Sequence, residues 1–139
     1  MTRKDRGATV IELALLMPVI LATVLLIVQM ALWFHGRQVA DAAAREAARV
    51  ARAAPYDSSG WETDAENKAM DIVRAIGPKL LSNPDVKATE EGVNERFVTV
   101  TGSAVQVIPL LPELTFTITS RFGGPVECFR PDDGSGACG

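Results

Sequence analysis

The feature that most constrains this chain is a long apolar run near its N-terminus. From Leu13 to Phe34 there is no charged residue, and only Thr23 and Gln29 are clearly polar. A helix of about 22 residues rises roughly 33 Å, which is enough to cross a hydrocarbon core of ~30 Å. Trp33 and Phe34 close the run, and aromatic side chains favour a membrane interface. The run therefore predicts a transmembrane helix.

Two other interpretations of this run are weaker. A buried core helix would need a large domain around it, and a chain of 139 residues has little left to build one. A cleaved secretory signal would suit the basic start formed by Arg3, Lys4 and Arg6, and the secreted domain would then begin beyond Ala40. However, the run exceeds the 7–15 apolar residues typical of a signal peptide, and Glu12 lies at its beginning.

Charge is divided unevenly along the chain. Residues 1–54 hold seven Lys/Arg and four Asp/Glu, whereas residues 55–139 hold seven and thirteen. The acidic second part would repel phosphates, so the sequence argues against a nucleic-acid partner. The basic N-terminal cluster suits anionic lipid headgroups and favours a cytoplasmic N-terminus. Cys128 and Cys138 fit this orientation, because a disulfide could join them in an oxidising compartment; the alternative is two unpaired thiols.

The helical pattern continues beyond the apolar run. Residues 37–54 are rich in alanine, the best helix former, and Gly36 weakens only one turn. Pro55 ends the helix, because the residue before a proline is pushed out of the α region. We therefore expect one rod over residues 8–54. Alanines at four-residue spacing favour packing against other helices, although alanine also simply makes good helix. These alanines are Ala40, Ala44, Ala48, Ala47 and Ala51.

The second part of the chain predicts a small head over residues 55–122. Apolar residues at three- and four-residue spacing indicate an amphipathic helix over residues 61–76, and Ser59 and Glu62 fit a capping box at its start. This apolar face is typical of a core-facing helix rather than a cofactor site. It consists of Trp61, Ala65, Ala69, Ile72, Val73, Ile76 and Leu80.

Strand patterns follow the amphipathic helix. Apolar and polar residues alternate over residues 95–107 and 114–122, with a weaker candidate over residues 86–90. The alternation slips at Gly102, which suggests a bulge. The economical fold is α+β, with the amphipathic helix laid on an antiparallel β-meander. The Gly, Pro and Asp content of residues 123–139 predicts an irregular tail.

No catalytic arrangement is recognisable in the sequence. The one histidine, His35, lies at the edge of the apolar run without a Ser or Cys partner at a meaningful spacing. Metal-ligand clusters and glycine-rich phosphate loops are absent. The sequence therefore predicts neither an enzyme nor a bound cofactor.

Glu12 is unusual because the sequence around it is already apolar, and a carboxylate at membrane depth is costly. The ordinary alternative is an interfacial glutamate hydrated by headgroups. The segment Arg3-Lys-Asp-Arg-Gly7, followed by Ala8-Thr-Val-Ile-Glu12, resembles the class III leader of type IV pilin-like proteins. A longer pattern resembles the TadE-like family of tight-adherence (Flp) pilus proteins. It comprises Arg6-Gly-Ala-Thr-Val-Ile-Glu-Leu-Ala-Leu-Leu-Met-Pro18, Arg37-Gln-Val and Ala43-Ala-Arg-Glu-Ala-Ala-Arg49.

This resemblance implies a minor pilin or pseudopilin. Residues 1–7 would be a leader that prepilin peptidase removes between Gly7 and Ala8 on the cytoplasmic side. The new ammonium group at Ala8 would lie one helical turn from Glu12, on the same chain or a neighbouring one, and would neutralise the carboxylate that directs assembly. Pro18 fits the family pattern and predicts a helix kink, because it removes one backbone donor.

The implied location is the bacterial cytoplasmic membrane, crossed once with the head outside, or an extracellular pilus. The implied partners are other pilin or pseudopilin subunits, the tight-adherence assembly platform, prepilin peptidase and membrane lipid. The alternative is a single-pass anchored accessory protein of the cell envelope that is neither processed nor polymerised.

Overall fold

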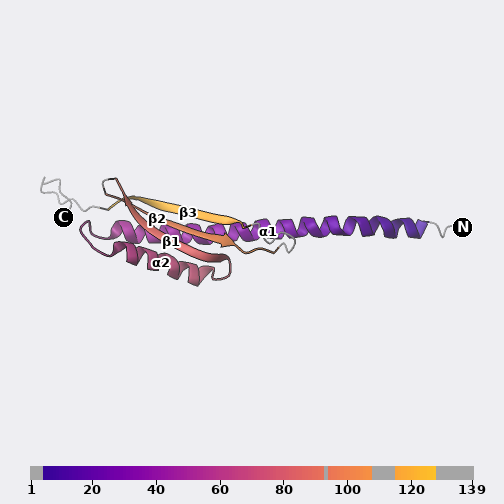
Figure 1. Ribbon diagram of the computed structural model, residues 1–139, viewed down its shortest axis with the longest axis horizontal. Helices are drawn as coiled ribbons and strands as arrows, with labels where there is room; N and C mark the ends of the chain where they lie inside the picture. Colours follow the sequence, from indigo (N-terminus) through magenta and orange to yellow (C-terminus); the bar gives the residue numbers. More distant parts are fainter. Residues whose placement is uncertain (1–4, 93, 108–114, 128–139) are drawn as a thin grey trace.

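The computed structural model describes residues 5–92, 94–107 and 115–127, with side chains from Val10 onward. Figure 1 shows the N-terminal part of α1 projecting alone from a small head, in which its C-terminal part lies against the other elements. The predicted α+β class with a long N-terminal helix is confirmed. In chain order the elements are α1 (Asp5–Ala53), α2 (Trp61–Ile76), β1 (Leu81–Glu91), β2 (Glu95–Ala104) and β3 (Thr117–Pro125).

α1 is one unbroken helix of 49 residues that passes through both Pro18 and Gly36. Pro18 leaves one carbonyl of the preceding turn without its backbone donor, and the kink expected there stays a prediction. Gly36 is buried at a close approach between α1 and the head. A Cβ atom at Gly36 would lie 2.8 Å from the Leu80 carbonyl oxygen and 2.9 Å from Ile118 Cδ1. The glycine that weakens the helix locally is therefore what lets the head pack against it.

The three strands form one antiparallel sheet in the order β1-β2-β3. β2 is the central strand, and its buried and half-buried residues alternate without a break from Arg96 to Ala104. β1 is longer than the expected strand over residues 86–90, because its pairing with β2 extends back to Leu81. The meander predicted from the alternating residues is therefore present in the structure.

The irregularity of the sheet lies opposite Gly102, where the bulge is predicted, but its extra residue belongs to β1. Gly102 pairs regularly with Ile118 of β3, whereas the β1 register shifts between Ser82 and Asp85. A Cβ atom at Gly102 would lie 2.6 Å from Leu81 Cγ. Glycine interrupts the apolar alternation here because the Leu81 side chain occupies the space.

Two helices cover one face of the sheet. The C-terminal part of α1 lies over β2 and β3, while α2 packs beside α1 and over β1 (Figure 1). The sequence places only the amphipathic helix on the sheet, whereas α1 is the larger part of the helical layer. Residues 36–53 therefore belong to the core of the head, and no free stalk separates the apolar run from it.

The alanine stripe of α1 is buried within this chain, so the small residues that favour packing against another helix lie against α2 and the sheet of the same head. Ala40, Ala44, Ala47 and Ala51 have no exposed surface, and Ala48 is 4% exposed. Small side chains bring the α1 backbone close to α2 and the sheet. The remaining buried apolar residues are Val39, Ala43, Trp61, Ala65, Ala69, Val73, Leu81, Val98, Val100, Ala104 and Ile118.

α2 has the predicted limits, Trp61–Ile76, but its N-terminus is not capped in the predicted way. Its N-cap is Gly60 with φ 91°, and no side chain caps the helix, so the capping box from Ser59 to Glu62 does not form. The left-handed conformation is one that glycine adopts readily. Ile76, expected on the apolar face, is 56% exposed because the helix ends there and the chain turns toward β1.

β3 extends to Pro125, where an irregular tail is expected from Gly123 onward. Gly123 pairs with Phe97 in the sheet, and a Cβ atom at Gly123 would overlap the Arg96 carbonyl oxygen and Phe97. The glycine content thus reflects close packing at this position rather than the end of the strand. Cys128 and Cys138 lie outside the described residues, as does most of the expected tail.

Candidate functional site

The predicted processing site lies at the beginning of α1. The helix starts at Asp5, so Gly7 and Ala8 belong to its first turns. Terminal turns of helices fray, because their first backbone N–H groups have no partner within the helix. The structure thus places the Gly7–Ala8 bond at the end of α1 that opens most easily.

Glu12 lies on the exposed surface of α1, four residues after Ala8. Residues four apart share one helix face, so the arrangement needed for pairing with an amino group at Ala8 is present in the backbone. Among the described residues, none forms a hydrogen bond or ion pair with the Glu12 carboxylate. With respect to the residues that the structure describes, this carboxylate is therefore open to a further partner.

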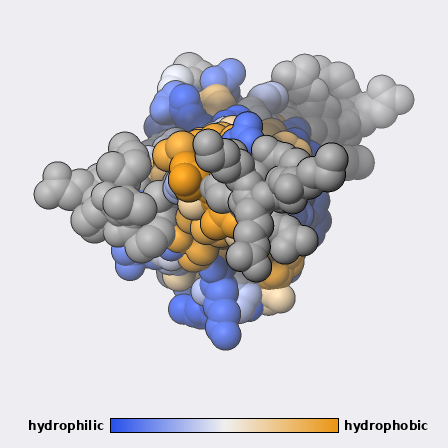
Figure 2. Space-filling view, turned by 90° about the vertical axis from the view of Figure 1, so that its right-hand side faces the viewer, coloured by the Kyte–Doolittle hydropathy of each residue, from blue (hydrophilic) through white to orange (hydrophobic). Residues whose placement is uncertain are grey.

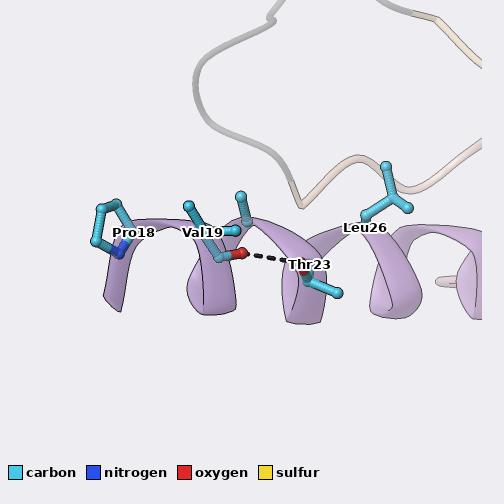
Figure 3. A pocket seen from close by; sticks show the side chains of 5 residues that line it. Pro18, Val19, Thr23 and Leu26 are labelled. Atoms are coloured by element: carbon cyan, nitrogen blue, oxygen red, sulfur yellow. Dashed lines mark hydrogen bonds between the residues drawn. The ribbon is translucent and has the colours of Figure 1, made fainter. Parts of the chain in front are cut away.

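An open groove follows on the same helix. Its lining consists of one helical stripe, with Pro18 and Leu26 at its two ends and small residues between them (Figure 3). The Thr23 hydroxyl donates a 2.8 Å hydrogen bond to the Val19 carbonyl oxygen, so the hydroxyl is satisfied within the helix. The groove therefore offers an apolar, hydrogen-bond-satisfied surface to lipid or to another apolar helix. Its lining residues are Pro18, Val19, Ala22, Thr23 and Leu26.

The N-terminal part of α1 is long and apolar enough to cross a membrane. None of the residues in its most apolar stretch is buried by the rest of the protein. Figure 2 looks along the helix from its N-terminal side and shows apolar surface in the middle of the view, with hydrophilic side chains around it. Large apolar side chains in this part are exposed; Leu15, Ile20 and Leu26, for example, are each more than half exposed. Such a surface is stable in lipid and not in water.

Arg96 is a structural centre of the head that the sequence analysis missed. Its side chain is among the fully buried ones, and its guanidinium lies at the C-terminal end of α1. Nη1 donates to the carbonyl oxygens of Ala51 and Ala54 at 2.8 and 3.0 Å. Nη2 donates to those of Pro55 and Tyr56, both at 3.2 Å.

These four bonds satisfy carbonyl groups at and just beyond the end of α1, where the helix dipole is negative and favours a cation. The Arg96 guanidinium also lies 4.5 Å from the centre of the Trp61 ring, at the start of α2. Arg96 thus joins β2, the end of α1 and the start of α2. The sequence could have indicated this role, because Arg96 lies two residues before Val98 and therefore on the same strand face as the buried Val98 and Val100.

Several charged residues in the C-terminal part of α1 have partners within the head. Asp41 accepts a 2.6 Å hydrogen bond from the Ser120 hydroxyl of β3. Hydrogen bonds from Arg49 lower the pKa of the Glu46 carboxyl, and the positive charges of Arg49 and Lys68 act in the same direction against desolvation. Arg52 donates to the Pro125 carbonyl oxygen at 3.0 Å. The C-terminal part of α1 is therefore fixed by polar contacts along its rim as well as by its alanines.

No chemistry beyond packing and charge pairing is visible in these residues. His35 is exposed, and its ring meets the edge of Phe34 at a centroid distance of 6.4 Å. In the part of the chain that the structure describes, no group of three or more His, Cys, Asp or Glu residues is placed to hold a metal ion. That the chain is not an enzyme stays a prediction.

Comparison with known proteins supports the resemblance at the N-terminus. Neither the curated proteins nor the solved structures contain a match to this chain. A family model does match, and it covers residues 7–49, from the predicted cleavage position to the buried part of α1. Over those residues the chain is similar to the TadE-like protein family, as its motifs indicate.

Proposed function

We propose that this chain is a minor pilin or pseudopilin of a tight-adherence pilus system, anchored by α1 and processed by prepilin peptidase after Gly7. The observation that carries the proposal is the TadE-like match over residues 7–49, which begins at Gly7 and includes the exposed Glu12 on α1. Processing would place an ammonium group at Ala8, one turn from the carboxylate. The partners would be other pilin subunits and the assembly platform.

The proposed orientation has the N-terminus in the cytoplasm and the head outside. The arginines that follow the apolar run nearly balance the basic leader in number, but two of them contact side chains at and after β3. Arg45 lies 4.7 Å from the centre of the Phe122 ring, and Arg52 pairs with Glu127 at 3.3 Å. The leader cluster, with Arg3, Lys4 and Arg6, then provides the basic side that cytoplasmic headgroups attract.

Mass spectrometry of the N-terminus of the chain purified from membranes tests the proposed processing. We expect a mature chain that begins at Ala8, and a Gly7→Val variant that keeps its leader. An intact Met1 in the native chain would favour the single-pass accessory protein instead. A start beyond Ala40 would indicate a domain released by signal peptidase, and either result would overturn the proposal.

Glu12→Gln tests the role of the carboxylate separately. We expect normal membrane insertion and processing but a loss of incorporation into pili or of pilus initiation, because the amide has no charge to pair with the Ala8 ammonium group. Glu62→Gln, at an exposed carboxylate on α2, is the matched control and should assemble normally. Normal assembly of Glu12→Gln would refute the assembly role.

A further inference from the structure

Gln29 is a buried polar residue in the otherwise exposed apolar part of α1. Its side chain is 2% exposed, whereas its neighbours Val28 and Met30 are 40% and 55% exposed. The carboxamide faces the segment that follows β2. Nε2 donates to the Val105 carbonyl oxygen at 3.0 Å, and Oε1 accepts from the Val107 backbone N–H at 2.9 Å. One side chain thus satisfies a backbone acceptor and a backbone donor far away in sequence.

The position of this contact along α1 places it within the apolar run. Gln29 lies five residues before Phe34, which corresponds to about 8 Å along a helix. The hydrogen bonds therefore hold residues 105–107 beside the helix at a level inside the charge-free run, and not above its end. Trp33 lies one turn further along, with the Arg37 guanidinium 5.9 Å from its ring centre, as suits a membrane interface.

The chemistry of residues 105–107 fits an apolar surrounding. These residues belong to no helix or strand, and irregular backbone at membrane depth is tolerated only where its polar groups are satisfied. Gln29 provides this for the Val105 carbonyl and the Val107 N–H. Val107 is 39% exposed, and its bond to Gln29 places it at the level of the exposed Val28 and Met30 along the helix. No charged residue occurs from Val105 to Pro112.

We propose that Val105–Val107 forms a second membrane contact, inserted in the interfacial region of the outer leaflet and held against α1 by Gln29. The occupant facing Val107 is lipid, because its exposed surface continues the lipid-facing surface of α1 at the level of Val28 and Met30. The head is then seated in the bilayer surface at a fixed depth rather than carried above it. This inference rests on the proposed role of α1 as the membrane anchor.

Depth-dependent fluorescence quenching tests the proposal on the full-length chain. Cys128 and Cys138 are replaced by serine, and an environment-sensitive NBD label is attached at Val107→Cys in vesicles of phosphatidylcholine and phosphatidylglycerol that contain doxyl-labelled lipid. Met30→Cys reports insertion of α1, and Thr119→Cys, exposed on β3, reports the head surface. We expect the label at position 107 to be quenched by doxyl lipid as at position 30, and that at position 119 to be quenched by aqueous iodide only.

The outcomes separate this inference from the anchor itself. Quenching by doxyl lipid at position 30 but not at position 107 would overturn the second contact and leave the anchor intact. Absence of quenching by doxyl lipid at position 30 would instead refute the membrane anchor on which the inference rests. Protection of position 107 from both quenchers would place protein, and not lipid, against it and would overturn the proposal.

A Gln29 variant tests whether the carboxamide holds the contact. Gln29→Leu keeps the side-chain size but leaves the Val105 carbonyl and the Val107 N–H unpaired. We expect lipid quenching at the position-107 label to fall and hydrogen exchange at residue 107 to accelerate by about tenfold, the change that a hydrogen bond of ~1.4 kcal/mol would give. Gln38→Leu, at an exposed glutamine of α1, is the control. Equal quenching and exchange in both variants would overturn the role of Gln29.

Discussion

The two parts of α1 are continuous in backbone but opposite in chemistry. In the first part large apolar side chains such as Leu15 and Ile20 are exposed, whereas in the second part alanines such as Ala44 and Ala47 are fully buried. Lipid accepts any large apolar side chain, so the first part needs hydrophobicity more than shape. The second part packs against α2 and the sheet, where each added methylene would clash. Within one helix, the first part therefore needs only sufficient hydrophobicity, whereas the second part needs side chains that fit closely against the head.

The largest expected effect comes from the residue that holds the end of the buried part. Arg96→Met removes four hydrogen bonds to carbonyl groups around the end of α1 and the stacking on Trp61. We expect the free energy of unfolding of the head to fall by about 3–5 kcal/mol, because buried acceptors lose their charged partner. Urea titration of the full chain in detergent micelles, followed by tryptophan fluorescence, measures the change.

Arg121→Met is the matched control for this variant. Arg121 also stacks on an aromatic ring, 4.1 Å from the centre of Phe97, and pairs with Glu91 at 2.6 Å, but its side chain is 45% exposed. We expect a loss of about 1 kcal/mol or less, as for exposed ion pairs. Similar losses in the two variants would contradict the idea that Arg96 acts by satisfying the end of α1.

A pair of identical substitutions tests the comparison between the two parts of α1 directly. Ala44→Leu adds three carbons to a fully buried position, and we expect the head to lose about 1–3 kcal/mol of unfolding free energy. Ala22→Leu makes the same change on the exposed groove of the first part, and head stability should stay the same. Urea midpoints in micelles measure both. Equal destabilisation by the two variants would show that fit matters as much in the first part as in the second.

Periodicity explains why much of the fold could be predicted. The apolar run has the length of a membrane span, the apolar residues of α2 repeat at helical spacing, and β2 alternates, so each element has a local signal. The alanine stripe carries no signal for what covers it, because small residues permit close approach to any partner. Gly102 marks the level of the bulge, but the sequence does not show that the extra residue is on β1 or that Leu81 fills the space beside the glycine.

The candidate site shows the same division between local and distant signals. Gly7, Ala8 and Glu12 stand out from a short motif, and the structure places them together at the start of α1. Arg96 and Gln29 act through carbonyl or amide groups at least 40 residues away in the sequence, and no local pattern specifies those partners. Their only sequence signal is a polar residue at an apolar position. A polar side chain with several hydrogen-bond donors at a position expected to be buried is therefore a candidate for joining two distant segments of the chain.

The smallest expected effect lies on the rim of the buried part, where Glu46 accepts hydrogen bonds from Arg49 at 3.0 and 2.6 Å. Because this pairing lowers the pKa of Glu46 from 4.5, its contribution to stability is present above the unfolded pKa and disappears as pH falls through the folded value. Glu46→Gln should therefore lower the urea midpoint slightly at pH 7, and the difference from the native chain should vanish in acid. Glu62→Gln, at an exposed carboxylate on α2, is the control and should show a smaller pH-dependent difference. A difference for Glu46→Gln that stays constant below pH 4 would assign the effect to packing of the side chain instead of its charge.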